Sequence, residues 1–299
     1  MSQLALPLPQ LCDAAIQAAL EAGQFIQSTD RSKLQRHFKK AGSSAASQLV
    51  TEVDVRSEAI IRLRLQAISE PWDIAFVGEE SSQSVADVIP ERLLKPYYWC
   101  VDPLDGTLPF VEGSPGYAVS IALVDQSGEP LIGVVYDPVD ATLLHAIKGQ
   151  GAYRDQALIA RATSVSTSLI VFADASFRLH EKYAHMLDTL NGCAHDSGLD
   201  SVEVVYGSGA VKNACQVLDY PAACYVKLPK FEDGGGSIWD FAATACIVGE
   251  AGGWVSNSYG QALDLNRRDS TFMNHQGVVY ASNERIARYL CISRNGGRP

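Results

Sequence analysis

The segment Asp102-Pro103-Leu104-Asp105-Gly106-Thr107 holds the residue types that a site for metal ions and phosphate needs. Its two carboxylates directly follow the apolar run 97–101, and a glycine and a threonine hydroxyl come next. A short helix over 107–110 can begin there, with Pro109 in a first turn where its missing donor is not needed. The N–H groups at such a helix start can hold phosphate oxygens. The pattern predicts a buried strand, a proline-stiffened turn and an anion site.

Further carboxylates stand at the expected ends of strands or helices. The full set is Asp54, Glu79 with Glu80, Asp102 with Asp105, and Asp240. Mg²⁺ prefers hard oxygen ligands and takes few of them from protein, whereas zinc sites use Cys and His, and no histidine stands near these acids. Two such cations can together activate a water and stabilise the attacking and leaving oxygens of a phosphoryl displacement.

Each of these acids also has a purely structural explanation. Asp102 precedes a proline and can form a turn, and the acids at 79–80 can be solvated loop residues. Asp54 can be a first-turn helix acid that interacts with the helix dipole. Asp240 has the spacing of a capping box with the serine three residues before it. Taken singly most of the acids favour these explanations, but their combination and order favour a site.

Hydrophobic periodicity predicts the elements that would position these acids. Helices are expected over 8–27, 51–69, 182–190 and 238–250, with another after Gly207-Ser208-Gly209. Strands are expected over 73–77, 97–101, 117–125, 131–136, 142–147, 149–153, 169–173, 202–205 and 222–227. The small polar stretch 39–47 is expected to form a mobile loop.

The two halves of the chain differ in their pattern. Hairpins and helices mix in the first half, whereas strands and helices alternate in the second. We therefore expect an α/β protein with an α+β domain over 1–160, which carries most of the predicted metal ligands, and an α/β domain over 161–299, which carries Asp240 and substrate-side residues.

Length and composition restrict the class of protein. The 299 residues suffice for a substantial core, and a net charge of −10 with a pI of about 5.1 argues against a broad basic face for nucleic acid polymers or anionic membranes. Seven cysteines without a Cys-x-x-Cys pair indicate a reducing compartment. No apolar run reaches the length of a membrane span. We expect a cytoplasmic protein, and the oligomeric state stays open, with a homodimer as one option.

With these residues in view, the chain resembles the inositol monophosphatase superfamily of magnesium-dependent, lithium-sensitive phosphomonoesterases. The resemblance covers about residues 50 to 280. It rests on the segments 78–81, 99–107, 110–113, 118–123, 238–243 and 250–253. It implies a fold of alternating helix and sheet layers, an αβαβα sandwich.

Carried over residue by residue, the resemblance implies a metal and phosphate site. One Mg²⁺ would be surrounded by Glu79, Asp102, the Leu104 carbonyl and Thr107. A second would be held by Asp102, Asp105 and Asp240, and Glu79 with water would hold a looser third. Gly106 and Thr107 would cradle the phosphate, while Thr107 with Asp54 would orient the attacking water.

The substrate side resembles one branch of the superfamily more than another. The segment 225–240 is longer than in inositol monophosphatases, and Lys227 stands where an inositol-contacting acid would align. This form, together with Ser208 and Lys212 after Gly207, looks more like the 3'(2'),5'-bisphosphate nucleotidases, which remove the 3'-phosphate from 3'-phosphoadenosine 5'-phosphate. A second phosphate needs cations, which Lys212, Lys227 or Lys230 can supply. The alternative is that these are ordinary surface lysines.

These observations lead to a ranked set of hypotheses. The first is a magnesium-dependent phosphatase that uses metal-activated water on a small phosphorylated metabolite, with a bisphosphate nucleotide as substrate. Inositol monophosphate is the alternative, and fructose 1,6-bisphosphate ranks third. Leu108 departs from the nucleotidase pattern, which often has lysine there. A catalytically silent relative that binds metal or anion is the non-enzyme hypothesis, and the complete set of acids argues against it.

Overall fold

The computed structural model describes residues 5–34, 36–38, 49–82, 89–162 and 164–291. The loop expected over 39–47 lies outside the described residues. The first two long helices are confirmed as α1 (Leu8–Ser28) and α3 (Glu52–Ser69), and Thr51 caps α3 with its side chain. A small antiparallel pair, β1 (Arg36–Phe38) with β2 (Leu49–Thr51), precedes α3.

The first large sheet contains the segment that bears Asp102 and Asp105. In spatial order its strands are β3 (Ile74–Gly78), β4 (Tyr97–Asp105), β5 (Ala118–Asp125), β6 (Pro130–Asp137), β7 (Thr142–Ile147), β8 (Ala152–Arg154) and β9 (Ala157–Leu158). β3 and β4 are parallel, whereas the later neighbours are antiparallel. The parallel register places Gly78, at the end of β3 and directly before Glu79, beside Val101, the residue before Asp102.

The predicted turn at Asp102–Asp105 is wrong. β4 continues through Asp105, and its register against β5 shifts between Asp102 and Asp105. A bulge of this kind accommodates Pro103, which has no N–H to donate to the ladder. Both aspartates therefore belong to a strand end that β5 supports, directly before the short helix α4 (Thr107–Glu112).

The second large sheet and its helices follow the predicted alternation of strand and helix. Its strands in spatial order are β11 (Ser201–Val205), β10 (Ser168–Phe172), β12 (Ala223–Lys227), β14 (Val278–Ala281) and β13 (Trp254–Ser256). The helices are α5 (Tyr183–Asp196), α6 (Ala210–Gln216), α7 (Ile238–Glu250) and α8 (Glu284–Leu290). Short 3-10 segments lie at Arg31–Lys33, Glu70–Trp72, Glu91–Leu93, Ala175–Leu179 and Val217–Asp219. The sequence did not predict β13, β14 or α8, and α5 is longer than expected.

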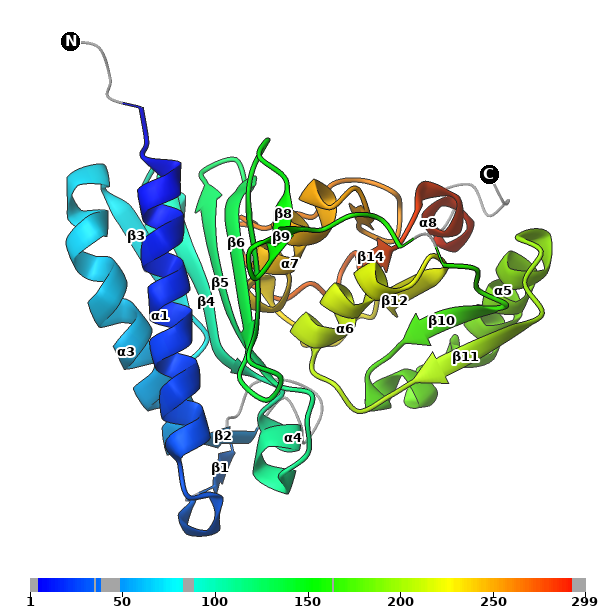
Figure 1. The fold of residues 1–299 in the computed structure, drawn as a ribbon, viewed down its shortest axis with the longest axis horizontal. Helices are drawn as coiled ribbons and strands as arrows, with labels where there is room; N and C mark the ends of the chain where they lie inside the picture. Colours follow the sequence, from blue (N-terminus) through cyan, green and yellow to red (C-terminus); the bar gives the residue numbers. More distant parts are fainter. Residues whose placement is uncertain (1–4, 35, 39–48, 83–88, 163, 292–299) are drawn as a thin grey trace.

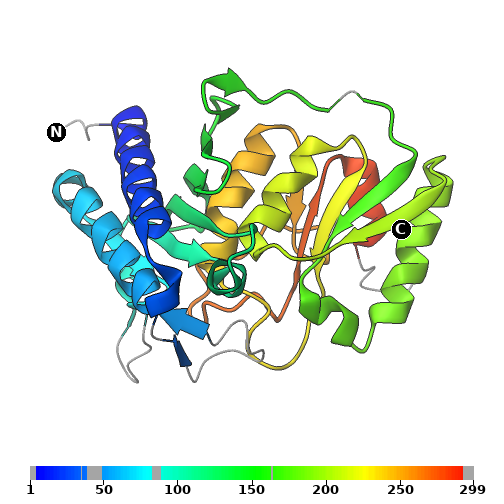
Figure 2. The ribbon, with the colours of Figure 1, turned by 60° about the horizontal axis from the view of Figure 1, so that its bottom comes forward.

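The elements form five layers (Figure 1), and three hydrophobic clusters fill the space between them, because the central cluster covers both faces of the middle helix layer. α1 and α3 cover one face of the first sheet, where Trp99 and Val101 point. α6 and α7 lie side by side between the two sheets (Figure 2), and α5 and α8 cover the far face of the second sheet. Alternation along β4 sends Tyr98 and Cys100 into the middle layer. The predicted αβαβα sandwich is confirmed.

The boundary between two domains stays a prediction. The chain leaves the first sheet after Leu158 and enters the second at Ser168. The central cluster nevertheless combines residues of both halves, such as Tyr98 with Phe241. The site described below also draws on both halves.

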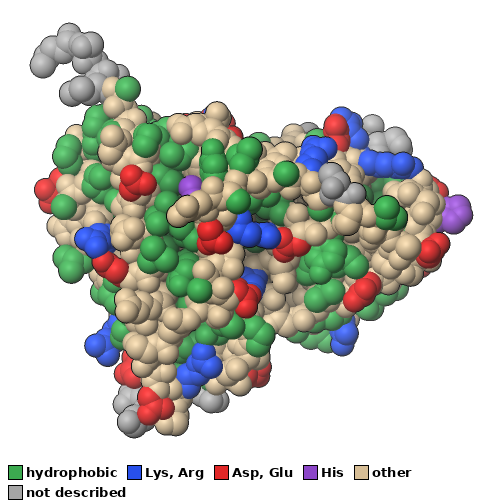
Figure 3. Space-filling model, viewed as in Figure 1, with side chains coloured by type: hydrophobic (Ala, Val, Ile, Leu, Met, Phe, Trp, Pro, Cys, Tyr) green, Lys and Arg blue, Asp and Glu red, His purple; other side chains and the backbone are tan. Residues whose placement is uncertain are grey.

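One face of the molecule carries charged side chains of both signs (Figure 3). On the face shown in Figure 3, basic and acidic side chains are interspersed and form no continuous basic patch. Among the helices that the structure describes, none has both the length and the apolar character that crossing a membrane requires.

Candidate active site

Three of the predicted metal ligands converge in the structure. Asp102 and Asp105 come from the end of β4 and Asp240 from the first turn of α7, and their ligand oxygens lie within 4.8 Å of one another. Asp102 and Asp105 are 1% and 6% exposed. A cluster of buried carboxylates is unfavourable unless a cation compensates it, and oxygen ligands of this kind suit Mg²⁺. The donor set therefore fits a divalent cation.

Glu79 belongs to the same electrostatic cluster. Burial raises the pKa of Asp102 well above its usual range, and the nearby charge of Glu79 raises that pKa further. Burial likewise raises the pKa of Asp240 to about 6, a shift that Lys227 opposes and Glu79 reinforces. Burial and the charge of Asp240 raise the pKa of Asp105. The metal-free cluster therefore resists full ionisation, as expected of a site built for cations.

Local backbone bonds aim the carboxylates of Asp102 and Asp240. The Leu104 N–H donates to Asp102 Oδ1 at 3.0 Å, across the bulge. The Ser237 N–H donates to Asp240 Oδ2, which is the capping interaction that the spacing predicted. The structural explanation for Asp240 and a metal-binding role are therefore compatible, because the cap fixes the direction of the carboxylate.

Asp105 links the two halves of the molecule. Its carboxylate accepts the N–H groups of Ala210 at 3.1 Å and Val211 at 2.8 Å, at the start of α6. A Cβ at Gly209 would lie 2.3 Å from Asp105 Oδ2, so only glycine permits this approach. The adjacent Ser208 packs its backbone against Gly116, which brings the predicted substrate-side segment to the site.

Thr107 lies where a strand end, α3 and α4 meet. Its Oγ1 donates to Asp54 Oδ1 at 2.9 Å and lies 3.3 Å from the Leu104 carbonyl oxygen. Asp54 Oδ2 accepts the Thr51 N–H at 2.8 Å, so Asp54 caps α3 and holds Thr107 at once. Gly106 has a φ of 82°, and a Cβ there would lie 2.7 Å from the Gly116 carbonyl oxygen. Both facts explain the glycine between Asp105 and Thr107.

Lys227 lies beside the carboxylates, and Asp174 pairs with it. Its Nζ is 3.0 Å from Asp174 Oδ2, and its side chain is 15% exposed. Burial lowers the pKa of Lys227, but Asp174 and then Asp240 outweigh burial, so the net pKa is raised. Asp174 also accepts the Tyr225 hydroxyl at 3.1 Å and the Asn213 amide at 3.2 Å. The sequence analysis did not select Asp174 as a site residue, although its position after an apolar strand could have indicated it.

Lys212 lies against a different part of the first sheet. Its Nζ forms an ion pair with Asp137 and lies 3.5 Å from Asp140 Oδ2. Its side chain is 14% exposed, so this cation is enclosed by two aspartates. The substrate roles of Lys212 and Lys227 stay predictions, and each would require a second anion to compete with a resident carboxylate.

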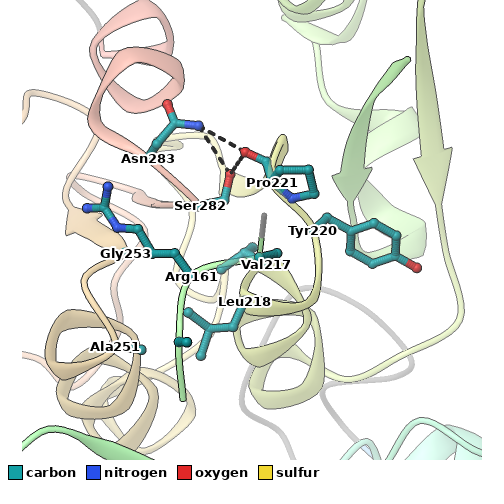
Figure 4. Close-up of a pocket in the computed structure, with 11 residues that line it drawn as sticks. Arg161, Val217, Leu218, Tyr220, Pro221, Ala251, Gly253, Ser282 and Asn283 are labelled. Atoms are coloured by element: carbon teal, nitrogen blue, oxygen red, sulfur yellow. Dashed lines mark hydrogen bonds between the residues drawn. The ribbon is translucent and has the colours of Figure 1, made fainter. Parts of the chain in front are cut away.

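A separate cavity of about 240 Å³ is lined by residues such as Arg161, Ser282 and Asn283 (Figure 4). The side chains of Ser282 and Asn283 both donate to the Pro221 carbonyl, at 3.0 and 3.1 Å. Arg161 donates to the Gly252 carbonyl. The described lining includes no carboxylate. The lining also lacks Asp102, Asp105 and Asp240, so the predicted metal site is not part of this cavity.

Comparisons with known proteins identify the family of this chain. The model of the inositol monophosphatase family matches residues 8–295. Inositol monophosphatase 1 of Homo sapiens is 31% identical over 295 residues, which cover 97% of each chain. Inositol monophosphatase 2 of Solanum lycopersicum is 31% identical over 261 residues, 87% of this chain and 92% of the relative.

Solved structures share the fold. The extragenic suppressor protein suhB of Bartonella henselae superimposes with a TM-score of 0.67 at 23% identity, covering 94% of this chain and 98% of that chain. The inositol monophosphatase of Anabaena gives 0.65 at 23% identity, covering 95% and 96%. The chain belongs to the inositol monophosphatase family of phosphoric monoester hydrolases, which act on small phosphorylated substrates and generally use Mg²⁺.

Proposed function

We propose that this chain is a magnesium-dependent phosphatase whose substrate is an inositol monophosphate. The convergence of Asp102, Asp105 and Asp240 carries the proposal. The curated relatives reported above are inositol monophosphatases, which supports the alternative hypothesis over the bisphosphate nucleotide. The ion pairs of Lys212 and Lys227 weigh against the nucleotide hypothesis as well, because two of the three lysines considered for a second phosphate already have aspartate partners.

The three aspartates would hold two Mg²⁺ ions, with Glu79 contributing to one of them and to a weaker third. When bound, the ions supply positive charge that stabilises the phosphate oxygens and lowers the pKa of a water. Thr107 keeps its proton directed at Asp54, so its Oγ1 lone pairs can accept a hydrogen bond from the attacking water and orient it. Backbone N–H groups at Gly106 and Thr107 would hold the phosphate.

The substrate is tested by phosphate release from three compounds in the presence of Mg²⁺: inositol 1-phosphate, 3'-phosphoadenosine 5'-phosphate and fructose 1,6-bisphosphate. We expect kcat/KM to be highest for inositol 1-phosphate, by about tenfold or more, which corresponds to about 1.4 kcal/mol of preference. A higher value for the nucleotide would restore that hypothesis. Release from none of them would favour the silent relative. Adding Li⁺ to the same assay tests the lithium inhibition that the resemblance implies.

Replacing Thr107 by Val is expected to lower kcat by about a hundredfold, with a smaller effect on KM. The substitution keeps the side-chain volume but removes the hydroxyl that bonds Asp54 and faces the Leu104 carbonyl. Positioned groups that handle a proton typically contribute on the order of 10²–10⁴ in rate. The matched control is Thr189→Val, since the Thr189 hydroxyl bonds only the His185 carbonyl within α5 among the described interactions. Normal kcat in Thr107→Val would exclude a role for the hydroxyl.

A further inference from the structure

The turn that carries Glu79 rests on a buried carboxylate of α3, that of Glu58. Glu58 is 4% exposed, and its Oε2 accepts the Glu80 N–H at 2.8 Å. A Cβ on Gly78 would lie 2.1 Å from the same oxygen, so the carboxylate fills the space that a larger residue at 78 would need. The Glu58 side chain thus contacts the backbone on both sides of Glu79.

Other bonds hold the same turn from different directions. The Glu79 N–H donates to the Val101 carbonyl at 3.0 Å, next to Asp102, and the Ser82 N–H donates to the Gly78 carbonyl at 3.0 Å. Arg62 donates to Ser81 Oγ at 2.7 Å. Among these partners Glu58 provides the bond to the residue that directly follows Glu79, and it does so from another layer of the fold.

One face of α3 therefore serves two parts of the site. Asp54, Glu58 and Arg62 follow at intervals of four residues and share a face of the helix. Asp54 holds Thr107, and Glu58 holds the turn that bears Glu79. Arg62 lies 3.7 Å from Glu58 Oε1, which offsets part of the charge of the buried carboxylate. Packing of α3 against the first sheet fixes these side chains relative to β3 and β4.

We propose that Glu58 is a positioning residue for the metal site. It holds the backbone of residues 78–80 so that the Glu79 carboxylate stays close to Asp102 and Asp240. The inference rests on the proposed function, in which Glu79 contributes to a metal site. A glutamate has three rotatable bonds, and fixing its backbone lowers the entropy that it loses when it binds an ion. Partners behind a metal ligand typically change metal affinity or activity by about 10- to 100-fold.

The test compares Glu58→Ala with Glu58→Gln by binding of Mn²⁺ to the substrate-free protein, followed by electron paramagnetic resonance, and by the Mg²⁺ concentration that gives half-maximal activity. In Glu58→Ala the Mn²⁺ affinity is expected to fall by about tenfold, with a matching rise in the Mg²⁺ requirement. In Glu58→Gln the amide oxygen can still accept the Glu80 N–H, so a change within about threefold is expected. Glu52→Gln, at an exposed glutamate of the same helix, is the control and should change neither.

Gly78→Ala gives an independent route to the same effect. The added Cβ displaces the Glu58 carboxylate, so Mn²⁺ affinity is expected to fall as in Glu58→Ala. The double variant is expected to lose no more than either single variant, because both remove one interaction. This variant also covers the case in which Glu58→Ala fails to fold.

Four results would overturn the inference: unchanged Mn²⁺ affinity in Glu58→Ala or in Gly78→Ala, a loss in Glu58→Gln as large as in Glu58→Ala, or no Mn²⁺ binding by the unchanged protein. Mn²⁺ binding needs no substrate. Normal binding by a protein that hydrolyses none of the three phosphates would therefore end the proposed function and leave the role of Glu58 to be decided by the variants.

Discussion

Asp102→Asn is expected to lower kcat for inositol 1-phosphate by about a hundred- to a thousandfold while raising the melting temperature of the metal-free protein. Asparagine keeps the volume of the side chain and an oxygen that can accept the Leu104 N–H. It removes one charge from a buried cluster that also contains Asp105 and Asp240. Metal ions typically supply several kcal/mol of charge stabilisation, and each 1.36 kcal/mol is worth about tenfold in rate.

The opposite signs of the two effects make this variant informative. A residue that only supported the fold would lower stability and activity together when it is replaced. The expected gain in stability arises because burial and neighbouring carboxylates disfavour the charged form of Asp102. Asp188→Asn, at an exposed position of α5, is the matched control and should change neither quantity. Full activity in Asp102→Asn, or a lower melting temperature, would contradict a metal-binding role.

The parts of the site that local sequence determines were predictable. Asp240 stands at the spacing of a capping box, and α7 begins at Ile238 as that spacing requires. The expected start of α4 after Gly106 also agrees with the structure. This start depends on local sequence, because glycine readily adopts the positive φ that the residue before α4 has. That acids far apart in the chain meet at one site was an expectation from the family resemblance and not from local sequence.

Features that depend on distant partners were not predictable. The expected turn at Asp102–Asp105 is a bulge because β5 continues to pair with β4 beyond the first aspartate. The ion pair of Lys212 with Asp137 joins residues 75 positions apart in the chain, so local sequence could not predict it, while the substrate role of Lys212 stays a prediction. β14, a run of four buried residues, was missed because short apolar runs do not distinguish strands from other buried segments.

Removal of divalent cations is expected to abolish phosphate release and to change how stability depends on pH. In the metal-free protein the pKa of Asp240 is about 6, above the value of about 3.8 for the free side chain, because burial disfavours the charged form. The folded state therefore retains a proton that the unfolded state loses first. The free energy of unfolding accordingly falls as pH rises from about 4 to about 6, by an amount on the order of 3 kcal/mol for this group.

Asp102 and Asp105 extend the fall in the free energy of unfolding toward higher pH, because burial raises their pKa values well above the usual range. Divalent cations bind the ionised carboxylates, so saturating Mg²⁺ is expected to remove the fall and to stabilise the protein most at the higher pH. Urea unfolding at pH 5 and pH 8, with a chelator and then with excess Mg²⁺, measures both effects.

Asp240→Asn isolates the contribution of Asp240 from those of the other titrating groups, which include Asp102 and Asp105. The variant lacks the carboxylate whose proton uptake is at issue, so its chelated form should lose less stability between pH 5 and pH 8 than the unchanged protein does. His275 acts in the opposite direction, because burial lowers its pKa and its contribution to stability rises with pH. An equal change in stability between pH 5 and pH 8 in the unchanged chain and in Asp240→Asn, both with chelator, would mean that folding does not raise the pKa of the Asp240 carboxyl, and the case for an uncompensated acid cluster that requires cations would fail.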